Sequence, residues 1–341
     1  MAFRDWLLGL FGRRGRVESE SGTGKGQKTH VIILDGTRSS LADGFETNAG
    51  LTYKLLCEVA DPSNLHLHYE AGIQWRHWKT TRYVVTGKGI NRQIERAYAA
   101  LAKEYAVNDR IILIGYSRGA FAVRSLAGVI DRVGLLRSEE TTEPRVAEAY
   151  RHYRKGEDDA ALRQFHDQYC HPDVRIDAVA VWDTVKALGW RFPILWRFTD
   201  AEQSFHNDQL GSHVLHGFQA LALDERRLAF RPLVWRTPEG WNGHVEQVWF
   251  RGVHSDIGGQ IGPSLQSRPL SNIPLVWMLT KLEDCGVVFP ANWKDRFEQD
   301  VHAPSVGAWR GWGKLFVLRR KRVVGQDTSE RIHPTVLEFQ R

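Results

Sequence analysis

The sequence predicts an α/β protein built on one mainly parallel sheet with helices on both faces. Short runs of apolar, β-branched residues, such as 30–34 and 111–114, alternate with longer segments of helical spacing, such as 89–105. Strands that alternate with helices in this way form parallel sheets, because each crossover returns the chain to the same end of the sheet. The chain has 341 residues, of which 42% are hydrophobic and 25% charged, so it is long enough to bury a large core.

The expected elements follow one another from residue 30 onwards. The strand at 30–34 runs into Asp35-Gly36-Thr37, a composition typical of a tight turn. Residues 186–212 crowd aromatic and aliphatic side chains together without a period, which predicts an insertion that forms a cap or lid. We expect strands at 30–34, 65–69, 111–114, 175–182, 230–235 and 246–250, and helices at 47–60, 89–105, 119–133, 143–169 and 274–285.

The first 28 residues differ from the rest of the chain. Residues 15–28 have the Gly-, Ser- and charge-rich composition of a linker. Before them, five apolar residues share one face of a helix that would suit a membrane interface: Phe3, Trp6, Leu7, Leu10 and Phe11. The alternative is a terminal helix that packs on the same chain. The sequence thus predicts an amphipathic segment and linker over 1–28, followed by one domain over 29–341.

Charge and cysteine content indicate which partners to expect. The formal net charge of +6 favours an anionic partner such as membrane phospholipid. The basic clusters, at 13–16 and 319–322, are small and carry no interleaved aromatics, so we expect no nucleic-acid groove. Cys57, Cys170 and Cys285 are widely spaced and form no CxxC pair, which predicts reduced thiols.

A nucleophilic serine is indicated by the sequence Gly115-Tyr-Ser117-Arg-Gly119, which has the pattern G-x-S-x-G. An apolar strand runs directly into this pattern and an apolar helix leaves it, which is the context of a nucleophile elbow. The serine would then lie at a helix N-terminus, where backbone N–H groups favour developing negative charge. We therefore predict Ser117 as the nucleophile of an α/β-hydrolase.

A serine nucleophile needs a base and an acid that orients the base, and in α/β-hydrolases these follow the serine in the order acid, then histidine. Asp183 ends the predicted strand at 175–182, at the sheet edge where such folds place their sites. His254 follows the strand at 246–250, in a segment predicted as a glycine-rich loop. Asp256 competes with Asp183 for the role of acid, and its alternative role is to order the loop around His254.

The predicted oxyanion hole needs two donors directed at the developing charge. The backbone N–H of Arg118, the residue after the nucleophile, is the first. The second is expected from the turn after the first strand, from Gly36 or Thr37, with Asp35 in a supporting role.

Several blocks follow one another along the chain: Leu34–Thr37, Gly115–Phe121, Val181–Val185, Ala220–Arg227 with Phe230–Pro232, Val248–Gly259 and Arg331–Pro334. Together they resemble the catalytic domain of the type VI secretion phospholipase effector family, a group of α/β-hydrolases. The resemblance runs from about residue 30 to 335, nearly the whole chain. It implies Ser117, Asp183 and His254 as a catalytic triad, with glycerophospholipids or related lipid esters as substrates.

The sequence therefore predicts a serine carboxylic-ester hydrolase that acts on lipid esters through an acyl-enzyme, a phospholipase that needs neither metal nor cofactor. One alternative is a soluble short-chain esterase or peptidase on the same fold, and another is a non-catalytic binding protein that keeps the fold. The N-terminal segment and the basic surface would bring the enzyme to a membrane. No signal peptide is recognised, which fits either a cytoplasmic enzyme or a substrate of a one-step secretion machine.

Overall fold

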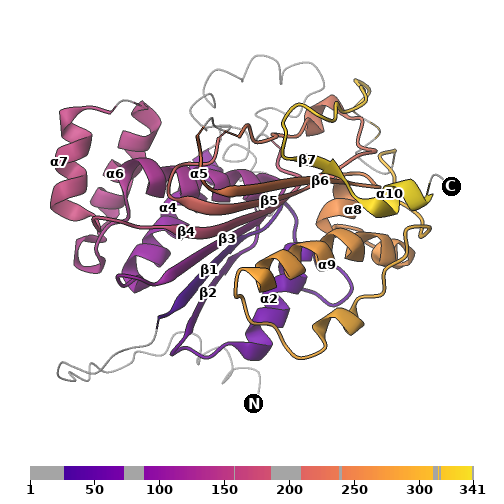
Figure 1. Ribbon diagram of the computed structural model, residues 1–341, viewed down its shortest axis with the longest axis horizontal. Coiled ribbons are helices and arrows are strands. Elements are labelled where there is room, and N and C mark those ends of the chain that lie inside the picture. Colours follow the sequence, from indigo (N-terminus) through magenta and orange to yellow (C-terminus); the bar gives the residue numbers. More distant parts are fainter. Residues whose placement is uncertain are drawn as a thin grey trace.

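Seven parallel strands form one sheet within the part of the chain that the structure describes (Figure 1). The structure is a computed structural model that describes residues 27–72, 88–156, 158–185, 209–237, 240–309, 314 and 316–339. The strand order is β2-β1-β3-β4-β5-β6-β7. The strands are β1 (Thr29–Leu34), β2 (Leu65–Glu70), β3 (Arg110–Tyr116), β4 (Ile176–Trp182), β5 (Val214–Ala222), β6 (His244–Phe250) and β7 (Glu330–Ile332).

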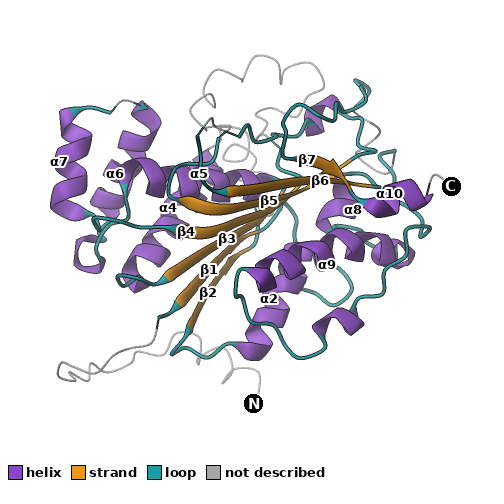
Figure 2. Ribbon diagram, in the orientation of Figure 1, coloured by secondary structure: helices purple, strands orange, loops and turns teal. Residues whose placement is uncertain are grey.

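Helices cover both faces of this sheet (Figure 2). One face packs against α4 and α5, on which α6 and α7 pack in turn, and the other face packs against α2, α8 and α9. The helices are α2 (Asn48–Val59), α4 (Lys88–Glu104), α5 (Arg118–Val133), α6 (Glu143–Lys155), α7 (Ala160–Tyr169), α8 (His254–Gly258), α9 (Arg268–Asp284) and α10 (Pro334–Phe339).

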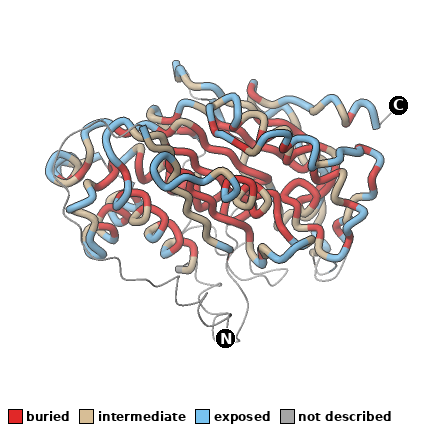
Figure 3. The backbone as a smooth tube through the Cα atoms, turned by 90° about the horizontal axis from the view of Figure 1, so that it is seen from below, coloured by how far each residue is buried: buried red, intermediate tan, exposed pale blue. Residues whose placement is uncertain are grey.

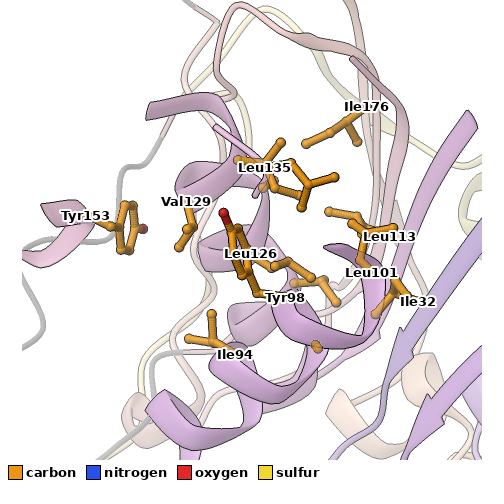
Figure 4. Close-up of a cluster of buried hydrophobic side chains, with 14 of the residues drawn as sticks. Ile32, Ile94, Tyr98, Leu101, Leu113, Leu126, Val129, Leu135, Tyr153 and Ile176 are labelled. Atoms are coloured by element: carbon orange, nitrogen blue, oxygen red, sulfur yellow. The ribbon is translucent and has the colours of Figure 1, made fainter. Parts of the chain in front are cut away.

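The two hydrophobic cores follow from the alternation of side chains along the strands. In β3, Ile111 and Leu113 enter the core under α4 and α5, whereas Ile112 and Ile114 enter the core under α2 and α9. Figure 4 shows the first of these cores, in which Leu113 lies among side chains from α4 and α5. Seen from below, buried backbone runs through the centre and exposed backbone lies in the outer helices and loops (Figure 3).

The chain order along the sheet reverses between β1 and β3. From β1 the chain crosses to β2 on one side, and from β2 it crosses back past β1 to β3 on the other side. Crossovers that leave in opposite directions open a crevice at the carboxyl ends of the strands, where doubly wound folds bind their ligands. The residues that follow β1, β3 and β4 at this edge are Asp35, Ser117 and Asp183.

The fold class is confirmed, because the chain forms a parallel α/β sheet of the α/β-hydrolase type. The strands predicted at 30–34, 65–69, 111–114, 175–182 and 246–250 are all present, with every end within two residues of its predicted position. The predicted insertion lies mostly outside the described residues, as do residues 1–26 of the N-terminal segment. No helix within the described ranges has the length and apolar character needed to cross a membrane.

The strand predicted at 230–235 is wrong. Residues Leu228–Phe230 form a 3-10 helix, and beyond it only Pro232 makes an isolated bridge, with Val185. Proline has no N–H to give to a strand ladder, which disfavours a strand here. The sheet instead uses β5, which the apolar pattern did not reveal because His216, Gly217 and Gln219 interrupt it.

Helix boundaries also differ from the prediction. The helix predicted at 143–169 is two helices, α6 and α7, because the chain takes a left-handed conformation at Gly156, with φ of 73°. The helix α9 begins at Arg268 and contains Pro274, at which we had expected it to begin. His254 begins the short helix α8 and does not lie in a loop as predicted.

Candidate active site

Ser117 lies at a strained turn between β3 and α5. Its φ of 57° and ψ of −117° are unusual for a residue with a side chain. The turn also brings backbones very close together, since a Cβ on Gly119 would lie 2.0 Å from the Leu34 carbonyl oxygen. Ser117 is therefore held at the N-terminus of a 16-residue helix, in the geometry of a nucleophile elbow.

Three predicted residues from distant parts of the chain meet at this turn. The Nε2 atom of His254 lies 2.8 Å from the Ser117 Oγ, and its Nδ1 atom lies 2.6 Å from Asp183 Oδ2. The Ser117 residue is 9% exposed, His254 3% and Asp183 0%. This arrangement allows the imidazole to accept the serine proton while the carboxylate stabilises the charge that results.

The imidazole of His254 is packed on two sides by aromatic rings. The rings of Tyr116 and Phe230 each lie 5.0 Å from it, measured between ring centroids. The Tyr116 hydroxyl also donates to the His254 main-chain carbonyl oxygen at 3.3 Å, and the His254 main-chain N–H donates to Glu225 Oε2 at 3.3 Å. These contacts fix the ring plane in line with both Ser117 and Asp183.

Asp183 is held by donors on both carboxylate oxygens. The N–H of Ala222, at the end of β5, donates to Oδ1 at 3.0 Å. The Arg322 guanidinium binds Oδ1 at 2.5 Å and Oδ2 at 2.9 Å. Burial would raise the pKa of Asp183, but the Arg322 charge and the His254 hydrogen bond outweigh it and hold the pKa well below its usual range.

Sequence reasoning missed Arg322. It belongs to the basic cluster at 319–322, which composition alone presents as a solvated surface. Its side chain is only 5% exposed, whereas Arg320 and Lys321 are exposed. The pattern gave no signal that one of these four residues turns inward, because that depends on the path of an irregular segment across the sheet edge.

Asp256 does not bond to the imidazole nitrogens; it lies in α8 and ties the start of that helix to residues 305–306. It accepts hydrogen bonds from the N–H groups of Val253 at 2.8 Å and Val306 at 2.9 Å, and from the Ser305 hydroxyl at 2.5 Å. Burial raises its pKa. Of the two acids that the sequence left open, Asp183 is the one in contact with His254.

The turn after β1 lies against the nucleophile, as expected for part of an oxyanion hole. A Cβ on Gly36 would lie 3.4 Å from the Ser117 Cβ. The Gly36 N–H, however, donates to Asp35 Oδ1 at 2.6 Å, and Asp35 Oδ2 accepts from Thr47 Oγ1 at 2.6 Å and Tyr69 Oη at 2.8 Å. Asp35 therefore organises the turn, and the Gly36 N–H is already engaged, which leaves Thr37 as the candidate donor on this side.

Comparisons with known proteins place the chain in a family. The catalytic domain of the Tle1-like phospholipase effectors of the type VI secretion system matches residues 28–281. The uncharacterized protein YEL023C of Saccharomyces cerevisiae is 29% identical over 232 residues, which are 60% of this chain and 32% of that protein. The chain thus spans about a third of the length of this curated relative.

Two solved structures are also similar. An uncharacterized protein from Pseudomonas aeruginosa has a TM-score of 0.47 at 16% identity, over 80% of this chain and 49% of that one. The Tle1 effector bound to the VgrG spike from the type 6 secretion system has a TM-score of 0.37 at 19% identity, over 75% of this chain and 56% of that one. On the strength of the match over residues 28–281, the chain belongs to the Tle1-like family of type VI secretion phospholipase effectors.

Proposed function

We propose that this chain is a serine carboxylic-ester hydrolase that cleaves lipid esters, as a phospholipase, with Ser117, His254 and Asp183 as its catalytic triad. The observation that carries the proposal is the continuous hydrogen-bonded path from the Ser117 hydroxyl through His254 to Asp183. The path lies at the carboxyl edge of the sheet, in a chain that belongs to a phospholipase family.

In the proposed reaction, the Ser117 Oγ attacks the acyl carbonyl carbon while His254 Nε2 takes the serine proton. The tetrahedral intermediate then collapses, and the imidazolium gives that proton to the departing alcohol oxygen. Water attacks the acyl-enzyme by the same route, with His254 again as base, and releases the fatty acid. Asp183 keeps Nδ1 protonated and stabilises the imidazolium in both halves, so the reaction requires no metal or cofactor.

The oxyanion would be held by the N–H of Arg118, at the start of α5, and by the N–H of Thr37. The Thr37 carbonyl oxygen accepts from Gln260 Nε2 at 2.8 Å, which fixes the turn against the segment that carries His254. Preorganised donors of this kind supply about 3–4 kcal/mol each to the stability of a tetrahedral intermediate.

Membrane association is the second part of the proposal. The segment that carries Arg322 borders the site. Its Phe316 ring lies 5.6 Å, between centroids, from the ring of Phe230, which packs against His254. Its neighbours Val317, Leu318 and Val323 are 65%, 45% and 55% exposed. Exposed Arg320 and Lys321 lie between these apolar side chains, a combination that suits an anionic lipid surface.

We extend the proposal to the domain organisation and to export. Residues 29–341 would form one catalytic domain with the insertion at about 186–212 as its lid, and residues 1–28 would be an appended membrane-directed segment. The family's description as secretion effectors supports export by the type VI machine over permanent residence in the cytoplasm.

The test is fatty-acid release from liposomes of phosphatidylglycerol and phosphatidylcholine, measured for the wild type and for Ser117→Ala. Loss of release on the order of 10⁶-fold in the variant is expected for a serine triad. If the wild type ignores liposomes but cleaves p-nitrophenyl acetate, the short-chain esterase is the correct function. If it cleaves neither and Ser117 does not react with a fluorophosphonate, the protein is a non-catalytic member of the fold.

A further inference from the structure

We propose that Arg322 is a positioning residue of this active site: it orients the Asp183 carboxylate and sets the pH range in which His254 acts as a base. The inference rests on the proposed function, because it assigns a role within the Ser117–His254–Asp183 triad. It also extends the site beyond residue 281, where the match to the family's catalytic domain ends.

The Arg322 guanidinium is fixed by four hydrogen bonds. Its Nη1 donates to Asp183 Oδ1 at 2.5 Å and to the Ala222 carbonyl at 2.8 Å. Its Nη2 donates to Asp183 Oδ2 at 2.9 Å and to the Phe230 carbonyl at 2.6 Å. The two-pronged contact with the carboxylate uses the planar fork of arginine, which a lysine cannot reproduce.

The pairing has a structural reason. Asp183 is fully buried directly after β4, with a φ of 40°, and its Oδ2 lies 2.6 Å from the His254 Nδ1. A buried carboxylate without a counter-charge takes up a proton, and a protonated acid would stabilise the imidazolium poorly. Arg322 keeps Asp183 ionised and fills the lone pairs that His254 and Ala222 leave, so Oδ2 stays directed at the imidazole.

The positive charge also acts on the imidazole itself. The proton that His254 takes from Ser117 creates a second positive charge on the other side of the same carboxylate. The remaining groups that face this pair are Glu225, which is paired with Arg227, the neutral phenol of Tyr116, and Asp35 behind Tyr116. Arg322 is the cation in direct contact with the pair, so its removal lets the Asp183–His254 pair hold an additional proton to higher pH.

The experiment compares Arg322→Met and Arg322→Lys with the wild type on a soluble p-nitrophenyl ester across pH 5–10. This substrate separates the role of Arg322 from membrane binding. The matched control is Arg163→Met, which breaks an Arg163–Asp158 pair at 2.9 Å whose side chains are 63% and 72% exposed. Thermal melting monitors folding throughout.

We expect Arg322→Met to lower kcat about 10²-fold, less than the roughly 10⁴-fold loss seen when a triad aspartate is neutralised, with little change in KM. The acidic limb of its kcat–pH profile should move to higher pH by about one unit, whether Asp183 or His254 holds the additional proton. Arg322→Lys should keep the acidic limb of the kcat–pH profile near that of the wild type, because the positive charge stays, and should lose part of kcat, because the two-pronged contact is lost. Arg163→Met should match the wild type in both.

A folded Arg322→Met with the pH profile and kcat of the wild type would overturn the inference. If Arg322→Met does not fold, Arg322→Lys decides, because a wild-type kcat in that variant contradicts the need for the two-pronged contact. If the wild type shows no hydrolysis that depends on Ser117, the proposed function is overturned together with this inference. The comparison of the wild type with Ser117→Ala distinguishes that result from an unchanged Arg322→Met in an active enzyme.

Discussion

The rings of Tyr116 and His254 are stacked, with centroids 5.0 Å apart and planes inclined by 29°. Tyr116 directly precedes Ser117 on β3, so the same strand end supplies both the nucleophile and the surface on which its base rests. Tyr116 is fully buried and also fills the space beside Gly36 and Gly258, where an added Cβ would lie 2.6 Å and 1.8 Å from its ring. One buried side chain thus packs between the turn after β1 and α8, and it lies next to Ser117 at the elbow.

Tyr116→Leu should therefore lower kcat about 10-fold or more, because the imidazole loses the ring that fixes its plane, and should lower the free energy of unfolding by about 3 kcal/mol. Tyr116→Phe keeps the ring and loses only the hydrogen bond to the His254 carbonyl, so kcat should stay within a few-fold of the wild type. Steady-state kinetics on a soluble ester and urea unfolding measure the two effects. Equal losses in both variants would show that the hydroxyl, and not the stacked ring, is what matters.

Asp183→Asn and Asp256→Asn should separate the two acids that the sequence alone left open. Asp183→Asn should lower kcat by about 10⁴-fold, because an amide at this position favours the wrong imidazole tautomer. Asp256→Asn should keep most of kcat and lower the free energy of unfolding by about 1–3 kcal/mol, since it weakens the bonds to Val253, Val306 and Ser305. The opposite pattern would make Asp256 the triad acid.

Gly119→Ala should be strongly disruptive. The added Cβ would lie 2.0 Å from the Leu34 carbonyl oxygen, so the elbow or β1 must move. We expect a loss of about 2–3 kcal/mol in the free energy of unfolding and a large fall in kcat. Gly128→Ala is the matched control, because in the same helix the atoms nearest to the added Cβ belong to the Tyr153 side chain, at 3.0 Å, and not to the backbone. Similar melting temperatures for the two variants would contradict the close approach at Gly119.

Asp35 should make the stability of the protein depend on pH. Burial raises its pKa from 3.8 to about 6, although four hydrogen bonds oppose the rise. Between these values the folded state binds more protons than the unfolded state, so the contribution of Asp35 to stability is present below pH 4 and is lost as the pH rises through 6. The wild type should thus lose about 2–3 kcal/mol of unfolding free energy relative to Asp35→Asn, which cannot titrate, between pH 4 and 7, and the difference should then level off. A flat difference in urea unfolding over this range would show that Asp35 titrates normally.

Leu318→Glu combined with Lys321→Glu should weaken binding to anionic vesicles and leave hydrolysis of a soluble ester unchanged. An exposed apolar side chain and a positive charge each favour binding to a negatively charged lipid surface. The two substitutions remove the first and reverse the second. Sedimentation with phosphatidylglycerol vesicles, with pure phosphatidylcholine as the control, measures the effect. Binding equal to that of the wild type would place the membrane-binding surface elsewhere in the chain.

The sequence by itself was enough to predict the α/β class, five of the strands, and Ser117, because these depend on local pattern. Apolar runs and helical spacing decide which segments form strands and helices, and the elbow is encoded within five consecutive residues. The sequence also placed Asp183 and His254 next to strand ends, where a parallel sheet gathers its site.

Other features were decided only by the tertiary structure. The strand β5 is buried on both faces between β4 and β6, so its neighbours stabilise a segment whose own pattern is mixed. The choice of Asp183 over Asp256 depends on which carboxylate reaches an imidazole 71 residues away along the chain. Arg322 lies 139 residues beyond Asp183 and contacts it because an irregular segment crosses the sheet edge. Local pattern carries no information about such contacts, since they are fixed by the path of the chain through space and by the charge that the buried Asp183 requires.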